Sequence, residues 1–235
     1  MTRIRVIDFE TTGLDPETSE VIEYGWCDLV RSEVGVWEVG KPAAHLYSVR
    51  AIPPEARAVH HITMEDVAEA FPFDEAEVHN PIEDVAVFAA HNLGFEDLFI
   101  PSRQLPGICT WKAALRVFPE APSHSNSVLR YWLEDRGLLS LDYDNAMPPH
   151  RAAPDAYVTA HILKAMLETG TTGREMVAWT KEPGVQPRCT LGKFRGKPWP
   201  EVETGFLQWM TRQADMDPDL KWNAQRELDR RGFGQ

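Results

Sequence analysis

Alternating apolar and polar positions predict a β-strand at the start of the chain. Residues 4–10 place four side chains on one face of this strand, namely Ile4, Val6, Asp8 and Glu10. The strand ends at the Thr-Thr-Gly turn of residues 11–13. Residues 21–30 and 45–50 predict two more strands around a turn-rich segment, so the N-terminal part reads as a meander.

Strand, turn and helix alternate through the middle of the chain. Residues 85–90 form a continuous apolar run, which is typical of a strand buried on both faces, and a turn and a helix follow it. The same order repeats at residues 108–118. Further helices are predicted over residues 127–136 and from Pro154 to near Gly170. These alternations predict an α/β fold in which helices flank a sheet.

The composition changes after about Lys181. Residues 182–198 are rich in proline and glycine, and two short helical patterns follow near residues 206–210 and 218–230. We therefore expect one domain over residues 1–180 and a small C-terminal module over residues 181–235.

Composition limits the class of protein further. With 43% hydrophobic residues, the 235-residue chain can bury one substantial core and a small appended module. Its three cysteines are scattered and form no CxxC pair, so we expect a reducing, cytoplasmic setting. The longest apolar run is too short to span a bilayer and no signal-peptide pattern is visible, so no membrane partner is expected.

The charge argues at first against binding to nucleic acid. The 24 basic and 36 acidic residues give a net charge of −12, which should repel a polyanion. The basic residues are nevertheless clustered, because no acid occurs between Arg188 and Pro200 or between Arg103 and Arg116. The first of these stretches interleaves Lys193, Arg195 and Lys197 with Phe194 and Trp199. Such a pattern is typical of contact with single strands, and the alternative is a glycine-rich turn with solvated charges.

Paired carboxylates are the main chemical feature. Asp8 and Glu10 lie two residues apart on a strand, so both point to one face at its C-terminal end, where open α/β sheets place their sites. A divalent cation would relieve their repulsion, although solvated acids at an exposed strand end are an equal alternative. Glu96 or Asp97 after the buried strand, and Asp155 in the first turn of the long helix, could join them or simply complement helix dipoles.

A histidine lies close to the last of these acids. His150 precedes Asp155 by five residues and follows two prolines, so it belongs to a loop beside a helix N-terminus. A histidine side chain can accept a proton near neutral pH, although a lone loop histidine is more often merely exposed. A functional interpretation of these acids and the histidine is favoured over the alternatives, because the residues occur in order along one α/β pattern.

Three segments of the chain resemble the DEDDh group of 3′–5′ exonucleases. They are Asp8–Gly13, His91–Glu96, and His150 with Asp155. Residues 150–155 and the late segment 191–197 are also similar to those of one DNA exonuclease within the group. The resemblance therefore extends over nearly the whole chain. It implies a ribonuclease H-like mixed sheet flanked by helices, followed by the small C-terminal module.

The resemblance also implies a set of functional residues. Two Mg²⁺ or Mn²⁺ ions would be held by Asp8, Glu10, Glu96 and Asp155, with His150 as the general base. The substrate would be a DNA 3′ end, single-stranded or duplex. Its expected contacts are Thr11, Thr12, Leu14, His91, Asn92, Lys193, Arg195 and Lys197. His91 and Asn92 could equally cap the helix that follows them.

One departure from the family pattern leaves two alternatives for activity. The third acid of the group is ordinarily an aspartate directly after the phenylalanine, whereas this chain has Glu96 there and Asp97 next. Glu96 keeps the register, and a local shift could present Asp97 instead. The alternatives to a DNA exonuclease are an exoribonuclease acting on short RNA and an end-binding protein whose catalysis is weakened at this position.

Overall fold

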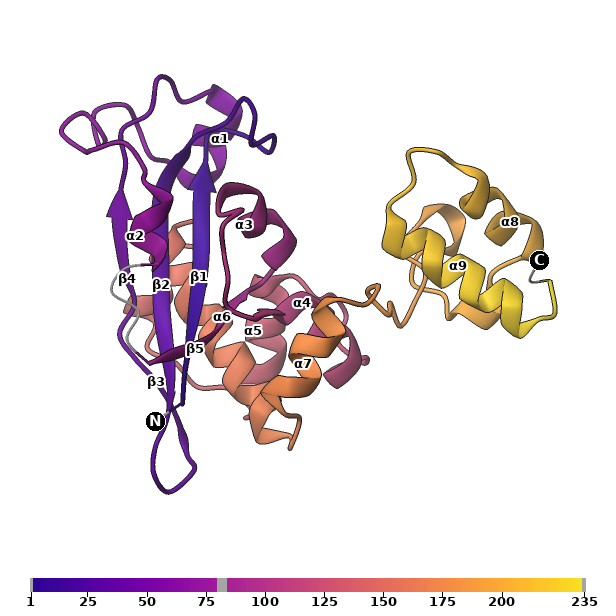
Figure 1. Cartoon of the computed structure of the whole chain (residues 1–235). Coiled ribbons are helices and arrows are strands. Elements are labelled where there is room, and N and C mark those ends of the chain that lie inside the picture. Colours follow the sequence, from indigo (N-terminus) through magenta and orange to yellow (C-terminus); the bar gives the residue numbers. More distant parts are fainter. Residues whose placement is uncertain (1, 80–83, 234–235) are drawn as a thin grey trace.

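A mixed six-stranded sheet forms the centre of the N-terminal part (Figure 1). The computed structural model describes residues 2–79 and 84–233. The sheet has the order β3-β2-β1-β5-β6, and β4 also pairs with β2. The strands are β1 (Thr2–Thr11), β2 (Val21–Arg31), β3 (Trp37–Val39), β4 (Ala43–Leu46), β5 (Val85–Ala90) and β6 (Gly107–Cys109). β1 runs antiparallel to β2 and parallel to β5, so it stands where the two halves of the sheet meet.

β1 contributes side chains to a core cluster on each of its two faces. Ile4 and Val6 join one core cluster with the long helix α6 (Ala152–Glu168), whereas Ile7 and Phe9 join a second cluster on the opposite face. Because side chains alternate along a strand, Asp8 continues the row of Ile4 and Val6 toward α6. The alternation therefore directs the acids of β1 to the face that carries the long helix.

Helices cover the sheet on both faces. The face with α6 also packs against α4 (Thr110–Val117), α5 (Asn126–Glu134) and α7 (Gly173–Thr180). The opposite face packs against α2 (Glu75–His79) and α3 (Leu93–Phe99). A short helix, α1 (Pro54–His60), and a 3-10 turn at Asp144–Ala146 complete this part. The sheet is thus enclosed, as the sequence predicted.

Residues after Thr180 build a core of their own. It contains Cys189, Phe194, Trp199, Val202, Leu207, Met210, Ala224 and Leu228. Most of these side chains come from α8 (Thr204–Arg212), α9 (Pro218–Arg230) and the 3-10 turns Gly192–Phe194 and Trp199–Glu201, whereas Cys189 and Val202 lie in the segments between elements. Figure 1 shows this C-terminal part beside the sheet domain, joined to it by one connecting segment.

The structure corrects several predicted boundaries. The strand expected over residues 45–50 is Ala43–Leu46. Tyr47 still donates its backbone N–H to Ile22 of β2, but Ser48 turns away and bonds Phe71 instead. The short elements β3 and α2 were not predicted. Among the described residues, no helix is long and apolar enough to cross a membrane.

Candidate active site

Three carboxylates converge where β1 meets the first turn of α6. One carboxylate oxygen from each of Asp8, Glu10 and Asp155 lies within 4.8 Å of the other two. Asp8 and Glu10 share a face because they are two residues apart, and Asp155 faces them from the buried side of α6. The structure therefore brings together three of the four predicted metal ligands.

The fourth predicted ligand, Glu96, is directed into the interior. Its residue is only 4% exposed, and its Oε2 atom has no hydrogen-bond partner in the described part of the chain. Asp97 next to it forms an ion pair with Arg103, in which Nε lies 2.5 Å from Oδ1 and Nη2 lies 2.7 Å from Oδ2. Asp97 is thus engaged by a cation of its own, whereas the Glu96 carboxylate is left uncompensated beside the other acids.

Burial and mutual repulsion raise the pKa of all four acids. Burial, reinforced by Asp155 and Glu10, raises the pKa of Asp8 well above its usual value. Burial raises the pKa of Glu10 and that of Glu96 to about 8, and neighbouring carboxylates add to both shifts. Burial also raises the pKa of Asp155.

These shifts indicate what the cluster is built to hold. Four ionised carboxylates without compensation would be costly, so the cluster favours either protons or a cation. A set made only of carboxylate oxygens suits a hard divalent ion. The unpartnered Oε2 of Glu96 supplies a further free donor atom of the same kind. The residues present therefore fit a divalent metal site.

Backbone contact sets how closely α6 approaches the sheet. A Cβ atom added to Gly25 of β2 would lie 2.1 Å from the Ala152 carbonyl carbon, so no larger residue fits there without moving the helix. This close approach is what carries Asp155 to the end of β1. Asn126 supports the same turn, because its Nδ2 donates to the Asp155 carbonyl oxygen at 3.3 Å.

A buried ion pair fixes the start of α6. Glu23 of β2, 3% exposed, accepts from Arg151 Nε at 2.9 Å and from Nη2 at 2.6 Å. It also accepts the backbone N–H of Ala152 at 2.9 Å, which satisfies a free donor of the helix N-terminus. Glu23 pairs across the strands with Glu10, so Arg151 compensates a charge directly beside the cluster. The sequence interpretation missed both residues, because an acid in a strand and an arginine in a loop gain meaning only from the strand register.

His150 lies at the open side of the carboxylates. Its residue is exposed and its backbone adopts a left-handed conformation with φ of 59°. Its backbone N–H donates to Asp155 Oδ2 at 3.1 Å. The hydrogen bond and the unusual backbone conformation hold the histidine next to the acids and leave its imidazole toward solvent.

The predicted contacts after β1 divide into two kinds. Thr11 Oγ1 donates to the Gly13 carbonyl oxygen at 2.7 Å, and Thr12 Oγ1 accepts the Glu20 backbone N–H at 2.9 Å, so both hydroxyls shape the turn. Leu14 is 80% exposed, although it is a large apolar side chain. The turn thus presents one exposed apolar residue close to the end of β1.

His91 and Asn92 also differ in whether the side chain is bonded within the protein or exposed. The His91 ring contacts Thr110 Oγ1 through Nδ1 at 3.1 Å and the His124 carbonyl oxygen through Nε2 at 2.8 Å. Burial lowers the pKa of His91 to about 4, so the ring is neutral and both of its nitrogens are engaged within the chain. Asn92 occupies the N-cap position of α3, is exposed, and makes no side-chain cap bond. Of the two alternatives for Asn92, the structure therefore contradicts the helix cap by its side chain.

The three predicted C-terminal cations are not equivalent. Lys193 pairs with Glu203 at 3.1 Å and Lys197 pairs with Glu201 at 3.5 Å. Arg195 is exposed, and its guanidinium forms no ion pair with the residues that the structure describes. Local acids thus compensate two of the three charges.

Comparisons with known proteins agree with this geometry. The sequence model of the family described as Exonuclease (RNase_T) matches residues 6–163. The chain belongs to this exonuclease family. It is therefore an enzyme of the class that hydrolyses phosphodiester bonds, and the predicted family is confirmed.

Individual relatives extend the match beyond the family domain. Exodeoxyribonuclease 10 of Escherichia coli K12 is 30% identical over 96% of this chain and 99% of its own length. Exonuclease X in complex with 5′ overhanging duplex DNA covers 75% of this chain and 99% of its own, with 29% identity and a TM-score of 0.61. The nuclease domain of 3′hExo, a DEDDh family member bound to rAMP, shares the fold at 20% identity and a TM-score of 0.52, covering 72% of this chain and 92% of its own. The ribonuclease H-like fold is thereby confirmed.

Proposed function

We propose that the chain is a metal-dependent 3′–5′ exodeoxyribonuclease, which removes nucleotides from single-stranded or duplex DNA 3′ ends. The convergence of Asp8, Glu10 and Asp155 beside the buried Glu96 carries this proposal. The similarity to exodeoxyribonuclease 10 over 96% of the chain supports the choice of DNA.

The four carboxylates would hold two Mg²⁺ or Mn²⁺ ions. When bound, such ions supply Lewis-acid polarisation of the scissile phosphate and stabilise its developing charge. Glu96 fills the third acidic position, because its carboxylate is buried toward the cluster while Asp97 is held by Arg103. The extra methylene of a glutamate is accommodated by this buried position.

His150 would act as the general base. Its imidazole accepts a proton from the attacking water, while Asp155 Oδ2 holds its backbone N–H and so keeps it beside the phosphate. Leu14 packs against the terminal base, and Asn92 binds the end of the strand. Thr11 and Thr12 position Leu14 through the turn that they stabilise.

We also propose that residues 181–235 form a separate module and that the enzyme works in the cytoplasm. The separate core of the C-terminal residues supports the module. The three cysteines, Cys27, Cys109 and Cys189, are free and buried, which supports a reducing setting.

A single experiment tests the activity. Purified protein is incubated with 5′-labelled and 3′-labelled DNA and RNA oligonucleotides, each with Mg²⁺, Mn²⁺ or EDTA. We expect a descending ladder from 5′-labelled DNA and immediate release of the 3′ label, both only with metal. Faster cleavage of RNA would instead identify an exoribonuclease. Bound but uncut DNA with both metals would identify an end-binding protein.

A further inference from the structure

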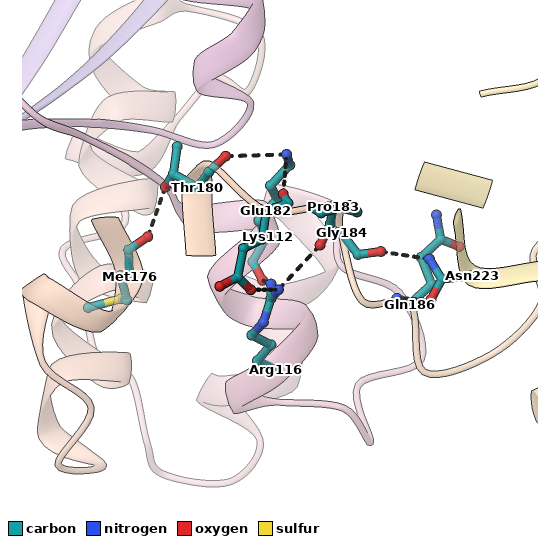
Figure 2. Close-up of polar contacts among 9 residues, drawn as sticks. All are labelled: Lys112, Arg116, Met176, Thr180, Glu182, Pro183, Gly184, Gln186 and Asn223. Carbon is teal, nitrogen blue, oxygen red and sulfur yellow. Dashed lines mark hydrogen bonds and ion pairs between the residues drawn. The ribbon is translucent and has the colours of Figure 1, made fainter. Parts of the chain in front are cut away.

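The connecting segment of residues 181–186 is fastened to the nuclease domain. Figure 2 shows its contacts with α4. Lys112 Nζ donates to the carbonyl oxygens of Thr180 at 3.3 Å and Glu182 at 2.8 Å. Arg116 pairs with the Glu182 carboxylate at 2.9 Å and donates to the Pro183 carbonyl oxygen at 3.2 Å. Three contacts from one helix thus hold the segment, and a fourth holds the last residue of α7, from which the segment leaves.

The same segment is fastened to the C-terminal module. Asn223 of α9 donates through Nδ2 to the Gly184 carbonyl oxygen at 2.7 Å, and its Oδ1 accepts the Gln186 N–H at 3.2 Å (Figure 2). Gly184 is buried, and an added Cβ would lie 2.9 Å from the Trp111 ring and 2.7 Å from Asp219 Oδ2. The nuclease domain and the module therefore meet at Gly184, where a larger residue would require Asp219 and Trp111 to shift, and the segment acts as a joint.

This joint places a cleft of about 1000 Å³ between the two parts. Side chains that can contact nucleic acid line it from both sides: Asn92, Trp111, Lys112 and His124 from the nuclease domain, and Arg188 and Arg195 from the module. Asn92 is the N-cap residue of α3, the helix that carries Glu96. One end of the cleft therefore begins next to the helix of the active site.

The charges along the cleft favour a polyanion. Arg195 is exposed, and in the described part of the chain no acid pairs with it. Among the lining acids, Asp97 is held by Arg103, and Asp217 caps α9 through the Leu220 N–H at 2.9 Å. The third, Asp219, is turned toward Gly184 at the joint.

The rings in the lining favour a single strand over a rigid duplex. Trp111 and His124 are both partly exposed and line the same cleft as Arg195. Rings beside unpaired cations suit a strand whose bases can stack while its phosphates are neutralised. A duplex would keep its bases stacked on one another and leave these rings unused.

We propose that the cleft binds the single-stranded DNA that lies on the 5′ side of the 3′-terminal nucleotide, with Arg195 contacting a phosphate. This proposal rests on the proposed exonuclease function, because it assigns the path of the same substrate. The anchored joint, rather than a general attraction of the module to DNA, holds Arg195 on that path.

Two matched variants test the cleft. Arg195→Ala removes its unpaired cation, whereas Arg226→Ala removes an exposed cation of α9 that lies outside the lining. Binding of a fluorescent oligothymidylate of about 20 nucleotides is followed by anisotropy in EDTA, where no strand is cut. We expect a loss of about fivefold for Arg195→Ala and less than about twofold for Arg226→Ala. The slope of log affinity against log salt should fall by about 0.7 for Arg195→Ala alone.

Equal affinities for the unaltered protein and the two variants would overturn the proposed binding of DNA in the cleft. Equal losses of affinity for the two variants would do the same. A separate readout keeps this result apart from that of the proposed function. Hydrolysis of a p-nitrophenyl ester of thymidine monophosphate by the unaltered protein needs the carboxylate site but no long strand. Absence of both ester and DNA cleavage, with tight Arg195-dependent binding, would reject the nuclease function and retain the cleft.

A third variant tests the joint. Arg116→Gln loosens the connecting segment without removing a residue of the cleft lining. We expect Arg116→Gln to lower the affinity for DNA about threefold. In a protein that already carries Arg195→Ala, adding Arg116→Gln should lower the affinity by less than threefold. Unchanged affinity, or full additivity of the two losses, would overturn the role of the joint.

Discussion

The catalytic edge and the C-terminal module treat buried carboxylates in opposite ways. At the end of β1, burial raises the pKa of Glu10 and of Glu96 to about 8. In the module, Glu227 is also nearly buried, yet hydrogen bonds from Arg230 and Arg231 lower its pKa to about 2. In the module, two arginines compensate the charge of the buried acid, whereas at the catalytic edge the acids are left for a ligand to compensate. This difference separates a structural charge from a functional one.

The largest effect that follows is on turnover. His150→Ala should lower the rate of DNA hydrolysis by about 10²–10⁴-fold, because it removes the proposed proton acceptor and none of the carboxylates. Single-turnover kinetics measure the rate, and the rise in melting temperature on adding Mg²⁺ checks that the carboxylate site is intact. Near-normal rates in this variant would reject the general-base role.

Removing the cation beside Glu23 should cost stability. Arg151→Met leaves Glu23 buried and unpaired, and we expect a loss of about 3 kcal/mol, toward the lower end for buried pairs because Arg151 is partly exposed. The matched variant in the module is Arg230→Met, where Glu227 keeps Arg231 at 2.7 Å. That change should cost clearly less than Arg151→Met, because Arg230 is exposed and its ion pair is screened by solvent. Denaturant unfolding measures both, and similar losses would contradict the contrast between the two regions.

The two regions should respond to pH with opposite signs. Because the pKa of Glu10 is raised from 4.5 to about 8, its contribution to stability is full below about pH 4.5 and lost as the pH rises through about 8. The lowered pKa of Glu227 gives stability that is present above about pH 4.5 and lost as the pH falls toward 2.

Calorimetry of the metal-free protein between pH 5 and 8.5 checks the first of these signs. The melting temperature should fall by more than about 5 °C over this range, since each kcal/mol lost corresponds to about 2–4 °C. Mg²⁺ should restore most of the loss at the alkaline end, and Glu10→Gln should flatten the dependence. A melting temperature that does not change with pH in the metal-free protein would contradict the charge repulsion described above.

The smallest effect concerns the exposed turn after β1. Leu14→Ala should leave the melting temperature unchanged, because this side chain is 80% exposed. It should lower kcat/KM on duplex ends about fivefold, as expected when part of a leucine surface no longer packs against the terminal base. Unchanged kinetics on both blunt and single-stranded ends would remove Leu14 from the substrate site.

The sequence predicted those parts of the site that depend on local pattern. Two-residue spacing placed Asp8 and Glu10 on one face, and the buried run of residues 85–90 predicted the strand before α3. The proposal of Glu96 over Asp97 draws on the structure, because the sequence does not show that Arg103 pairs with Asp97.

What the sequence could not provide was pairing between distant residues. Glu23 and Arg151 are 128 positions apart, and neither has a neighbour that marks it as part of a pair. The predicted bounds of the strand over residues 45–50 were wrong for a similar reason, since the contact of Ser48 with the distant Phe71 takes the chain away from β2 after Ala43–Leu46. Local periodicity is readable from residue types, but register and long-range ion pairs are set by the assembled fold.

The contact between Gly25 and the backbone of Ala152 bears on how this enzyme could be re-engineered. Because main chain rests on main chain, the spacing between sheet and helix has no adjustable side chain and cannot be tuned by small changes of volume. Attempts to widen the substrate range should therefore leave this contact alone and vary the exposed turn after β1. Libraries built on that turn would alter what enters the site while the spacing of its carboxylates stays constant.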